Sequence, residues 1–319
     1  MLKRLLSIKP LLLAALIATT FAAGADADSP ARPEAKATPP VPLLWKVSDQ
    51  DNAVYLLGSF HLLRPSDYPL SGDVSAAFED AEAVVFELSP AEMASSALPT
   101  QMMQAALRQD GKSLQDDLDA ATWQKLQNYA NQNNLPLANF ATFEPWFVGL
   151  SISILEMTKQ GLDPKLGLDT HFMEIAKKAG KPTDGLELAG DQIRMLDGMD
   201  AVEQRQFIAE ALEQAEKGPA EMEALHRAWR NGDADLLWSK MAGDMKREYP
   251  RLYQRINVDR NDAWLPKIQQ RLSQSDSDDT LVVVGALHLL GSDGVVEKLR
   301  GKGYKVERVC SVCESEIKR

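Results

Sequence analysis

The sequence predicts an α/β fold in which β-α-β units from the N- and C-terminal parts of the chain form a central mixed sheet. A large helical insertion joins the two units. Two matching segments support this prediction: Val54–Leu63 reads VYLLGSFHLL, and Leu281–Leu290 reads LVVVGALHLL. Each begins with a short apolar run that ends in glycine, which is typical of a buried strand. Most of the chain between them has apolar residues at helical spacing, which predicts the insertion.

The composition is that of a soluble globular protein, and 319 residues suffice for one large domain. The formal net charge is -11 and the isoelectric point is near 5.0. Proteins that bind nucleic acids usually present a basic face, so we expect no nucleic-acid partner.

The first residues have the features of a secretory signal peptide, which we place at residues 1–27. Lys3, Arg4 and Lys9 form a basic start, and the apolar stretch Leu11–Phe21 is too short to span a bilayer comfortably. Ala25–Ala27 offers a small-x-small cleavage site. The sequence therefore predicts export to the periplasm or the extracellular space, with no transmembrane segment after cleavage. A retained membrane anchor is the alternative.

Residues 28–42 are rich in Pro and Ala and predict an extended, mobile linker before a single domain at residues 43–313. The domain begins with two predicted strands, Leu43–Val47 and Ala53–Leu57. The polar cluster Ser48–Asn52 between them predicts a hairpin. The second strand leads directly to His61.

The first β-α-β unit continues with a helix within Tyr68–Ala81 and a strand at Ala83–Leu88. Glu87 ends that strand. Neighbouring parallel strands present their carboxyl ends at the same edge of a sheet, so Glu87 is expected beside His61. A solvent-facing glutamate at a frayed strand end is the alternative.

The spacing of apolar residues in the insertion, about residues 90–275, predicts eight helices. They are Met93–Gln109, Ala120–Asn133, Glu144–Gln160, Leu168–Ala179, Ala201–Glu216, Glu221–Asn231, Leu236–Glu248 and Asp262–Ser273. Thr183–Leu188 is a short extended stretch that carries Glu187. The tryptophans of these helices are interpreted as core packing.

Polar residues near the starts of two of these helices could serve as caps or as site residues. Asp169 suits a helix cap or a first-turn acid, and Asn261 suits a helix N-cap. Arg260 could instead hold a carboxylate or a substrate oxygen through a bidentate contact. His171 and His226 are interpreted as histidines on helix surfaces.

The second unit comprises a strand at Thr280–Val284, a turn at Gly285–His288, a helix at Gly294–Gly301 and a strand at Tyr304–Val309. Each histidine of the repeated segments is therefore expected just past the end of a core strand. In open α/β sheets, that edge is where ligands bind.

Cys310 and Cys313 are the two cysteines of the chain, and they follow the last predicted strand. Export makes a disulfide permissible. A redox motif would open a helix after a strand, and zinc would need further soft ligands nearby. A local disulfide that pins the C-terminal part of the domain is the favoured interpretation.

His61, His288 and Glu87 could together bind a divalent metal such as Mn, Co, Zn or Fe. Such an ion lowers the pKa of bound water and polarises a carbonyl, while a free glutamate acts as general base. A metal-free site, with a histidine as base for ester hydrolysis, is also possible. A third possibility is a site that binds haem or a metal without catalysis.

The ordered set of motifs resembles the TraB/GumN family. The set is Gly58-Ser59-Phe60-His61, Glu87, Gly167-Leu168-Asp169, Gly185-Leu186-Glu187, Arg260-Asn261 and Gly285-x-x-His288. The family includes the Tiki proteins, described as divalent-metal-dependent peptidases that act on Wnt. It is also similar to a wider group that contains erythromycin esterase and haem-binding ChaN-like proteins.

The resemblance implies an α/β core with a helical insertion and a cleft built from the two GxxH motifs. His61, His288 and Glu87 match the positions expected to bind metal. Glu87, Glu187, Arg260, Asn261 and Asp169 match polar positions expected to be catalytic. The residues after Glu187 read Leu-Ala-Gly-Asp-Gln, where the family pattern leads one to expect a threonine.

The function expected from the sequence is that of an exported, metal-dependent hydrolase, with a peptidase as the first choice and a small ester as the other substrate. One alternative is a non-catalytic periplasmic protein that binds haem or a metal. Another is an accessory protein for envelope or polysaccharide assembly, which family relatives alone suggest.

Overall fold

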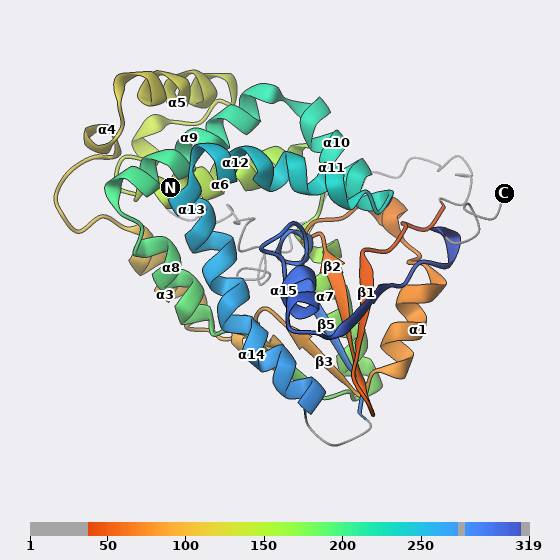
Figure 1. The fold of residues 1–319 in the computed structure, drawn as a ribbon. Helices are drawn as coiled ribbons and strands as arrows, with labels where there is room; N and C mark the ends of the chain where they lie inside the picture. Colours follow the sequence, from red (N-terminus) through yellow and green to blue (C-terminus); the bar gives the residue numbers. More distant parts are fainter. Residues whose placement is uncertain (1–37, 274–277, 314–319) are drawn as a thin grey trace.

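The computed structural model describes residues 38–273 and 278–313 (Figure 1). The expected signal peptide and residues 28–37 of the expected linker lie outside these ranges. Within them, no helix is both long and apolar enough to cross a membrane.

Six strands form one mixed sheet in the order β4-β3-β5-β2-β1-β6. Their bounds are β1 Leu44–Ser48, β2 Ala53–Ser59, β3 Ala83–Phe86, β4 Thr183–Gly185, β5 Thr280–Gly285 and β6 Lys305–Arg308. Strand β1 pairs antiparallel with β2 and β6, and the other pairings are parallel. Strands β2 and β5 are buried along their whole length, as their apolar runs predict. The α/β fold with a mixed sheet is therefore confirmed.

The two predicted β-α-β units cross the sheet in opposite directions. Helix α1 (Gly72–Asp80) connects β2 to β3 past β5, and α15 (Val295–Gly301) connects β5 to β6 past β2 and β1. The winding of the sheet therefore reverses between β2 and β5. In open α/β folds, ligands bind beyond the carboxyl ends of the strands at such a switch point.

The chain between β3 and β5 is largely helical, as predicted. Its α-helices are α2 Pro90–Met93, α3 Leu98–Ala106, α4 Leu114–Asp117, α5 Ala120–Gln132, α6 Pro145–Lys159, α7 Leu168–Ala179, α8 Ala189–Asp197, α9 Ala201–Lys217, α10 Pro219–Arg230, α11 Ala234–Trp238, α12 Asp244–Glu248, α13 Pro250–Tyr253 and α14 Asp259–Ser273. Two π-helical segments, η6 (Ser239–Gly243) and η7 (Gln254–Val258), join α11 to α12 and α13 to α14. Short 3-10 turns are η3 Pro65–Asp67, η4 Leu137–Asn139, η5 Pro164–Leu166 and η8 Ala286–Leu289.

Helices cover both faces of the sheet and one end of its strands (Figure 1). Helix α7 packs on β3 and β5, and a ring contact of 5.7 Å between Phe78 and Phe172 places α1 beside α7. Helix α14 packs on β2 and on α15. Helices α5, α6 and α9 gather around a separate apolar cluster that includes Leu126, Ile152 and Leu212.

Several local predictions differ from the structure. The helix predicted at Met93–Gln109 is shorter in the structure: α2 ends at Met93, and α3 runs from Leu98 to Ala106, with Pro99 in its first turn. The extended stretch predicted at Thr183–Leu188 is shorter than predicted, since only Thr183–Gly185 forms a strand, β4, at an edge of the sheet. The N-cap predicted at Asn261 is wrong, because η7 continues into α14 and leaves both Arg260 and Asn261 inside the helical run.

The interpretation of His226 as a surface histidine is also wrong. Its side chain is buried in α10, and its Nε2 lies 2.8 Å from Oδ2 of the fully buried Asp67. Aromatic contacts to Phe60 and Trp229 enclose the ring. His171 is half-buried, and its ring lies 4.9 Å from that of Tyr68.

Hydrogen bonds to backbone carbonyls hold the first described residues against the rest of the domain. The N–H of Val41 donates to the carbonyl of Arg230 at 2.7 Å, and Arg308 donates through Nε to the carbonyl of Pro42 at 3.0 Å. Residues 38–42, the described part of the predicted linker, therefore contact the folded domain. Cys310 and Cys313 form the predicted local disulfide.

Candidate active site

The register of the central strands brings the two repeated motifs together. Strands β2 and β5 are parallel, and Ser59 pairs with Gly285 at their carboxyl ends. His61 follows Ser59 by two residues, and His288 lies in the 3-10 turn η8 after Gly285. Both histidines therefore flank the switch point of the sheet.

Two acids reach the same edge from the next strands. Phe86 of β3 pairs with Val283 of β5. Glu87, the next residue, therefore lies near the carboxyl end of β5. The N–H of Glu187 donates to the carbonyl of Glu87 at 3.0 Å, which places Glu187 beside it. Glu87 is buried, so the alternative of a solvent-facing glutamate is wrong.

Asp169 holds the imidazole of His61. Its Oδ1 lies 2.9 Å from Nδ1 of His61 and accepts a hydrogen bond from Ser59 Oγ at 2.8 Å. A carboxylate can only accept, so Nδ1 of His61 carries the proton and Nε2 is directed elsewhere. Asp169 lies in the first turn of α7, as predicted.

Gly167 makes this arrangement possible. A Cβ at this position would lie 2.1 Å from the carbonyl oxygen of His61, a distance that no side chain tolerates. Glycine therefore allows the start of α7 to press against the loop that carries His61, and it sets the distance from Asp169 to the ring.

Arg260 is the buried cation of the site. Its Nη2 donates to Glu87 Oε2 at 2.5 Å, and its Nε donates to Glu187 at 3.1 and 3.2 Å. Its guanidinium also lies over the ring of Trp264, 4.8 Å from the centroid. One arginine thus pairs with two carboxylates at the sheet edge.

Both ring nitrogens of His288 are engaged. Nε2 lies 3.0 Å from Nη1 of Arg260, which can only donate, and Nδ1 lies 2.8 Å from Oδ1 of Asn261. The ring is therefore a neutral imidazole with its proton on Nδ1. Asn261 is in turn fixed by donating to the carbonyl of Asp293 at 2.8 Å.

The two histidines differ in pKa because their charged neighbours differ. Burial lowers the pKa of His61, but the carboxylates of Asp169 and Glu87 more than offset burial and raise that pKa to about 9. Burial and the Arg260 cation lower the pKa of His288 to about 3. The metal-free protein at neutral pH therefore holds one imidazolium and one neutral imidazole.

Glu87 stays ionised although it is buried. Burial raises its pKa, but the guanidinium of Arg260 and the two histidines outweigh burial and hold that pKa at about 2. The N–H of Gly285 also donates to Glu87 Oε1 at 2.8 Å. This oxygen lies 3.9 Å from Nε2 of His61.

Gly285 leaves open the space beside these two atoms. A Cβ here would lie 3.2 Å from both Glu87 Oε1 and His61 Nε2. We expect Gly285→Ala to lower kcat/KM about 10–100-fold, because displacement of reacting groups by a fraction of an ångström is costly. The measurement is hydrolysis by the variant, with urea unfolding to check the fold. Gly72→Ala, at a position with open space, should leave both unchanged, and equal effects of the two changes would contradict the prediction.

The neutral state of His288 should make stability depend on pH. Its pKa is about 3 in the fold and about 6.5 in the unfolded chain, so the unfolded chain binds an extra proton between these values. This contribution to stability is present above pH 6.5 and is lost as the pH falls toward 3, at about 1.4 kcal/mol per pH unit. Urea unfolding from pH 7 to pH 4 should show a steeper loss for the wild type than for His288→Gln. If the unfolding free energy falls with pH equally in the two proteins, the prediction is wrong.

The structure thus gathers His61, Glu87, Asp169, Glu187, Arg260, Asn261 and His288, all the site residues predicted from the sequence, around one sheet edge. Two further contributors received no role from the sequence. Ser59 and His61 both contact Asp169. Their i, i+2 spacing at a strand end could have indicated this, because alternate residues of a strand face the same side. Trp264 follows Arg260 by four residues on the same helix face and lies 4.4 Å from the His288 ring.

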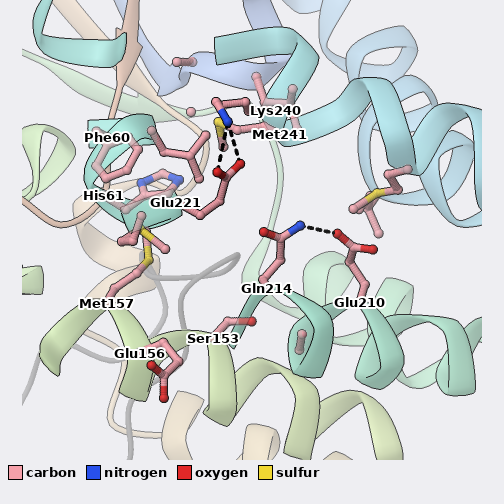
Figure 2. Close-up of a pocket in the computed structure, with 18 of the residues that line it drawn as sticks. Phe60, His61, Ser153, Glu156, Met157, Glu210, Gln214, Glu221, Lys240 and Met241 are labelled. Atoms are coloured by element: carbon pink, nitrogen blue, oxygen red, sulfur yellow. Dashed lines mark hydrogen bonds and ion pairs between the residues drawn. The ribbon is translucent and has the colours of Figure 1, made fainter. Parts of the chain in front are cut away.

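A cavity of about 210 Å³ opens beside His61. Helices α6, α8, α9, α10, α12 and α13 and the segments η6 and η7 line it, together with Phe60, His61, Arg260 and the turn that carries His288. Figure 2 shows His61 and Phe60 on one side of this space and Ser153, Gln214 and Glu210 on another. The insertion therefore lies over the carboxyl ends of the strands and encloses the site.

Comparison with known proteins gives one family and two relatives. The model of the TraB/PrgY/gumN family matches residues 43–308. "Uncharacterized protein YbaP" of Escherichia coli K12 is 24% identical over 258 residues, which are 77% of this chain and 87% of the relative. A protein of the same name from Shigella flexneri matches to the same extent. No solved structure matches the chain.

Proposed function

This chain belongs to the TraB/PrgY/gumN family, and from its strand-end cluster we propose that it is a hydrolase that uses a divalent metal ion. The observation that carries the proposal is the setting of His61. Asp169 orients its ring at 2.9 Å, Glu87 lies 3.9 Å from its other nitrogen, and a cavity opens beside it. An oriented imidazole beside a carboxylate in a pocket is a common arrangement for proton transfer or metal-assisted hydrolysis.

The residues around Gly285 fit a metal ion in part. Nε2 of His61 and Oε1 of Glu87 are 3.9 Å apart, so these two residues could together hold a divalent ion. Asp169 would fix the ring through Nδ1, as carboxylates do for metal-bound histidines. When bound, such an ion would activate water and polarise a carbonyl.

His288 is placed differently from His61. Its Nε2 faces the guanidinium of Arg260, so it could bind an ion only if that hydrogen bond were broken. Among the described residues, no group of three or more His, Cys, Asp or Glu side chains is arranged to hold an ion. We therefore assign the ion to His61 and Glu87 and expect water or substrate to complete its ligands.

The remaining charged residues position these two groups. Glu187 accepts hydrogen bonds from Arg260, from Trp264 at 3.2 Å and from Gln192 at 2.5 Å, so its oxygens are already used. It is therefore a positioning residue for Arg260 rather than a general base. Arg260 in turn fixes Glu87 and keeps it ionised.

A second candidate is metal-free ester hydrolysis, in which His61 itself transfers the proton. The observation that favours it is Arg260, which already supplies a fixed positive charge 2.5 Å from Glu87. In this case Asp169 holds the ring, and Nε2 of His61 exchanges a proton with the water or with the leaving group.

The test is metal content and hydrolysis measured on the same protein. The purified protein is dialysed with Mn, Co, Zn or Fe separately, analysed by mass spectrometry for bound metal, and assayed with peptide and ester libraries. We expect one ion per chain, lost in His61→Ala and kept in His171→Ala, with hydrolysis that follows the ion. Full activity after chelation would overturn metal dependence in favour of the second candidate. A Soret band with added haem and no hydrolysis would favour a haem-binding role.

We also propose that the protein is exported. The support is the signal-like sequence at residues 1–27, together with a disulfide at Cys310 and Cys313 that suits an oxidising compartment. Mass spectrometry of the protein recovered from the periplasm should give an N-terminus near residue 28. An uncleaved chain in the membrane fraction would contradict this proposal.

A further inference from the structure

The cavity beside His61 has a mainly apolar wall that is rich in methionine. The methionines that line it are Met157, Met195, Met222, Met241 and Met245. They come from five different elements, so they surround the space rather than forming one stripe. Methionine side chains are flexible and adapt to apolar ligands of different shapes. The wall therefore suits an apolar group that can bend.

The polar side chains of the wall are largely engaged with one another. Lys240 donates to both oxygens of Glu221 at 2.7 and 3.0 Å, and Gln214 donates to Glu210 at 2.7 Å (Figure 2). The hydroxyl of Ser153 donates to a carbonyl of its own helix at 3.1 Å. These contacts satisfy part of the hydrogen-bonding capacity of each polar group within the wall itself.

This wall is poorly suited to an extended peptide. An extended peptide in a cleft can satisfy its amides by pairing with an exposed strand edge. In the described part of the chain, the cavity is lined by helices and by the ends of the inner strands β2 and β5, whereas β4 and β6 form the sheet edges. A buried peptide group without a hydrogen-bond partner is costly, and a hydrocarbon chain has no such group.

The size of the cavity sets the length of the ligand. At about 210 Å³ it exceeds the roughly 150 Å³ of an engineered cavity that binds benzene. It is smaller than the roughly 300–1,000 Å³ of pockets for drug-sized molecules. A medium-length chain fits these limits better than a large ring system.

We propose that the substrate is an ester of a neutral, medium-chain acyl group, with the chain in the cavity and the carbonyl at His61. This inference rests on the proposed hydrolytic function. Hydrolysis breaks the bond between the acyl carbon and the ester oxygen and forms a bond from that carbon to a water oxygen. One proton of the water goes to the leaving alkoxide, and the products are a carboxylic acid and an alcohol.

The first test is a chain-length series of p-nitrophenyl esters from acetate to decanoate. Each methylene that enters the cavity should raise kcat/KM about fourfold until the cavity is full, after which the rise stops. His61→Gln should abolish the activity toward every ester. A flat series with active wild-type enzyme would overturn the acyl proposal and leave the hydrolase proposal intact, as would cleavage of peptides alone.

A matched pair of variants on α6 tests the cavity itself. Ser153 lines it, whereas Thr158 is exposed, and each hydroxyl donates to a carbonyl four residues earlier. Ser153→Phe should shorten the preferred chain and lower the ratio of kcat/KM for octanoate to that for acetate at least tenfold. Thr158→Phe should leave this ratio unchanged, and a similar fall in both variants would overturn the proposal.

Binding of unreactive N-methylalkanamides, which carry the alkyl chain on the carbonyl carbon as the proposed substrate does, is followed by calorimetry and separates the two proposals. Affinity should rise with alkyl length in the wild type and fall in Ser153→Phe. Chain-dependent binding without hydrolysis of any ester would support the cavity assignment while the proposed function fails. The absence of binding at every chain length would overturn the cavity assignment.

Discussion

Hydrolysis by the His61→Gln variant is expected to fall about 10²–10⁴-fold, the usual contribution of a proton-transfer group. Glutamine has a similar length and can still donate a hydrogen bond to Asp169. Its amide, however, can neither exchange a proton near neutral pH nor replace the imidazole as a metal ligand. The measurement is kcat/KM with the best substrate found by the library assay, at matched protein and metal concentrations.

The control for this substitution is His171→Gln. His171 is half-buried on α7, the helix that carries Asp169, and its ring contacts Tyr68 instead of the site. This variant should keep wild-type activity, and thermal unfolding should show that His61→Gln remains folded. Activity within threefold of wild type in a folded His61→Gln protein would exclude His61 from the chemistry.

Arg260→Met is expected to cost about 3–5 kcal/mol of unfolding free energy at pH 7, because it removes one partner of a buried ion cluster. Methionine fills much of the space but leaves the buried Glu87 without a cation. Burial of Glu87 then raises its pKa without opposition from the guanidinium. Protonation of Glu87 should therefore reduce the loss of unfolding free energy as the pH falls from 7 toward 5, and urea unfolding at each pH measures that loss.

The matched control for this change is Arg247→Met. Arg247 also pairs with two carboxylates, Asp244 at 2.6 Å and Glu248 at 3.0 Å, but all three side chains are exposed. Solvent screens such pairs, so we expect little change in stability at any pH. A deficit of similar size in both variants would show that burial of the Arg260 cluster is not what makes it important.

The central strands and the residues of the site could be predicted from the sequence, because both follow a local pattern that occurs twice in the chain. The apolar runs before Gly58 and Gly285 required burial on both faces, and parallel pairing then aligned their ends. The order of the strands in the sheet was harder to predict. Nothing in the sequence of β3 indicates that β5, formed almost two hundred residues later, lies between it and β2.

The errors arose where tertiary contacts override a local signal. Asn261 is an acceptable N-cap residue, but the π-helical turn η7 extends the helical run past it, and apolar periodicity does not reveal such a turn. His226 looked polar and exposed on α10. It lies between Leu225 and Trp229 on the face that packs on the core, and Asp67 supplies the partner that makes its burial possible.

The lining of the cavity could not be predicted for a related reason. Four of its helices, α6, α8, α10 and α12, carry methionine among other apolar residues, and the sequence does not say which helix faces turn toward another helix. The cavity depends on how α6, α9 and α10 meet above the sheet, which is a property of their packing.

The pairing of Ser59 with Gly285 also has a consequence for how the protein folds. Half of the site lies in the first strands to be synthesised and half near the end of the chain, so contacts of very long sequence separation must form last and fold slowly. Until β5 arrives, β2 is a mainly apolar strand with an unpaired edge, which is a feature that promotes aggregation. Nascent chains, and chains clipped before β5, are therefore expected to be inactive and to need protection from self-association.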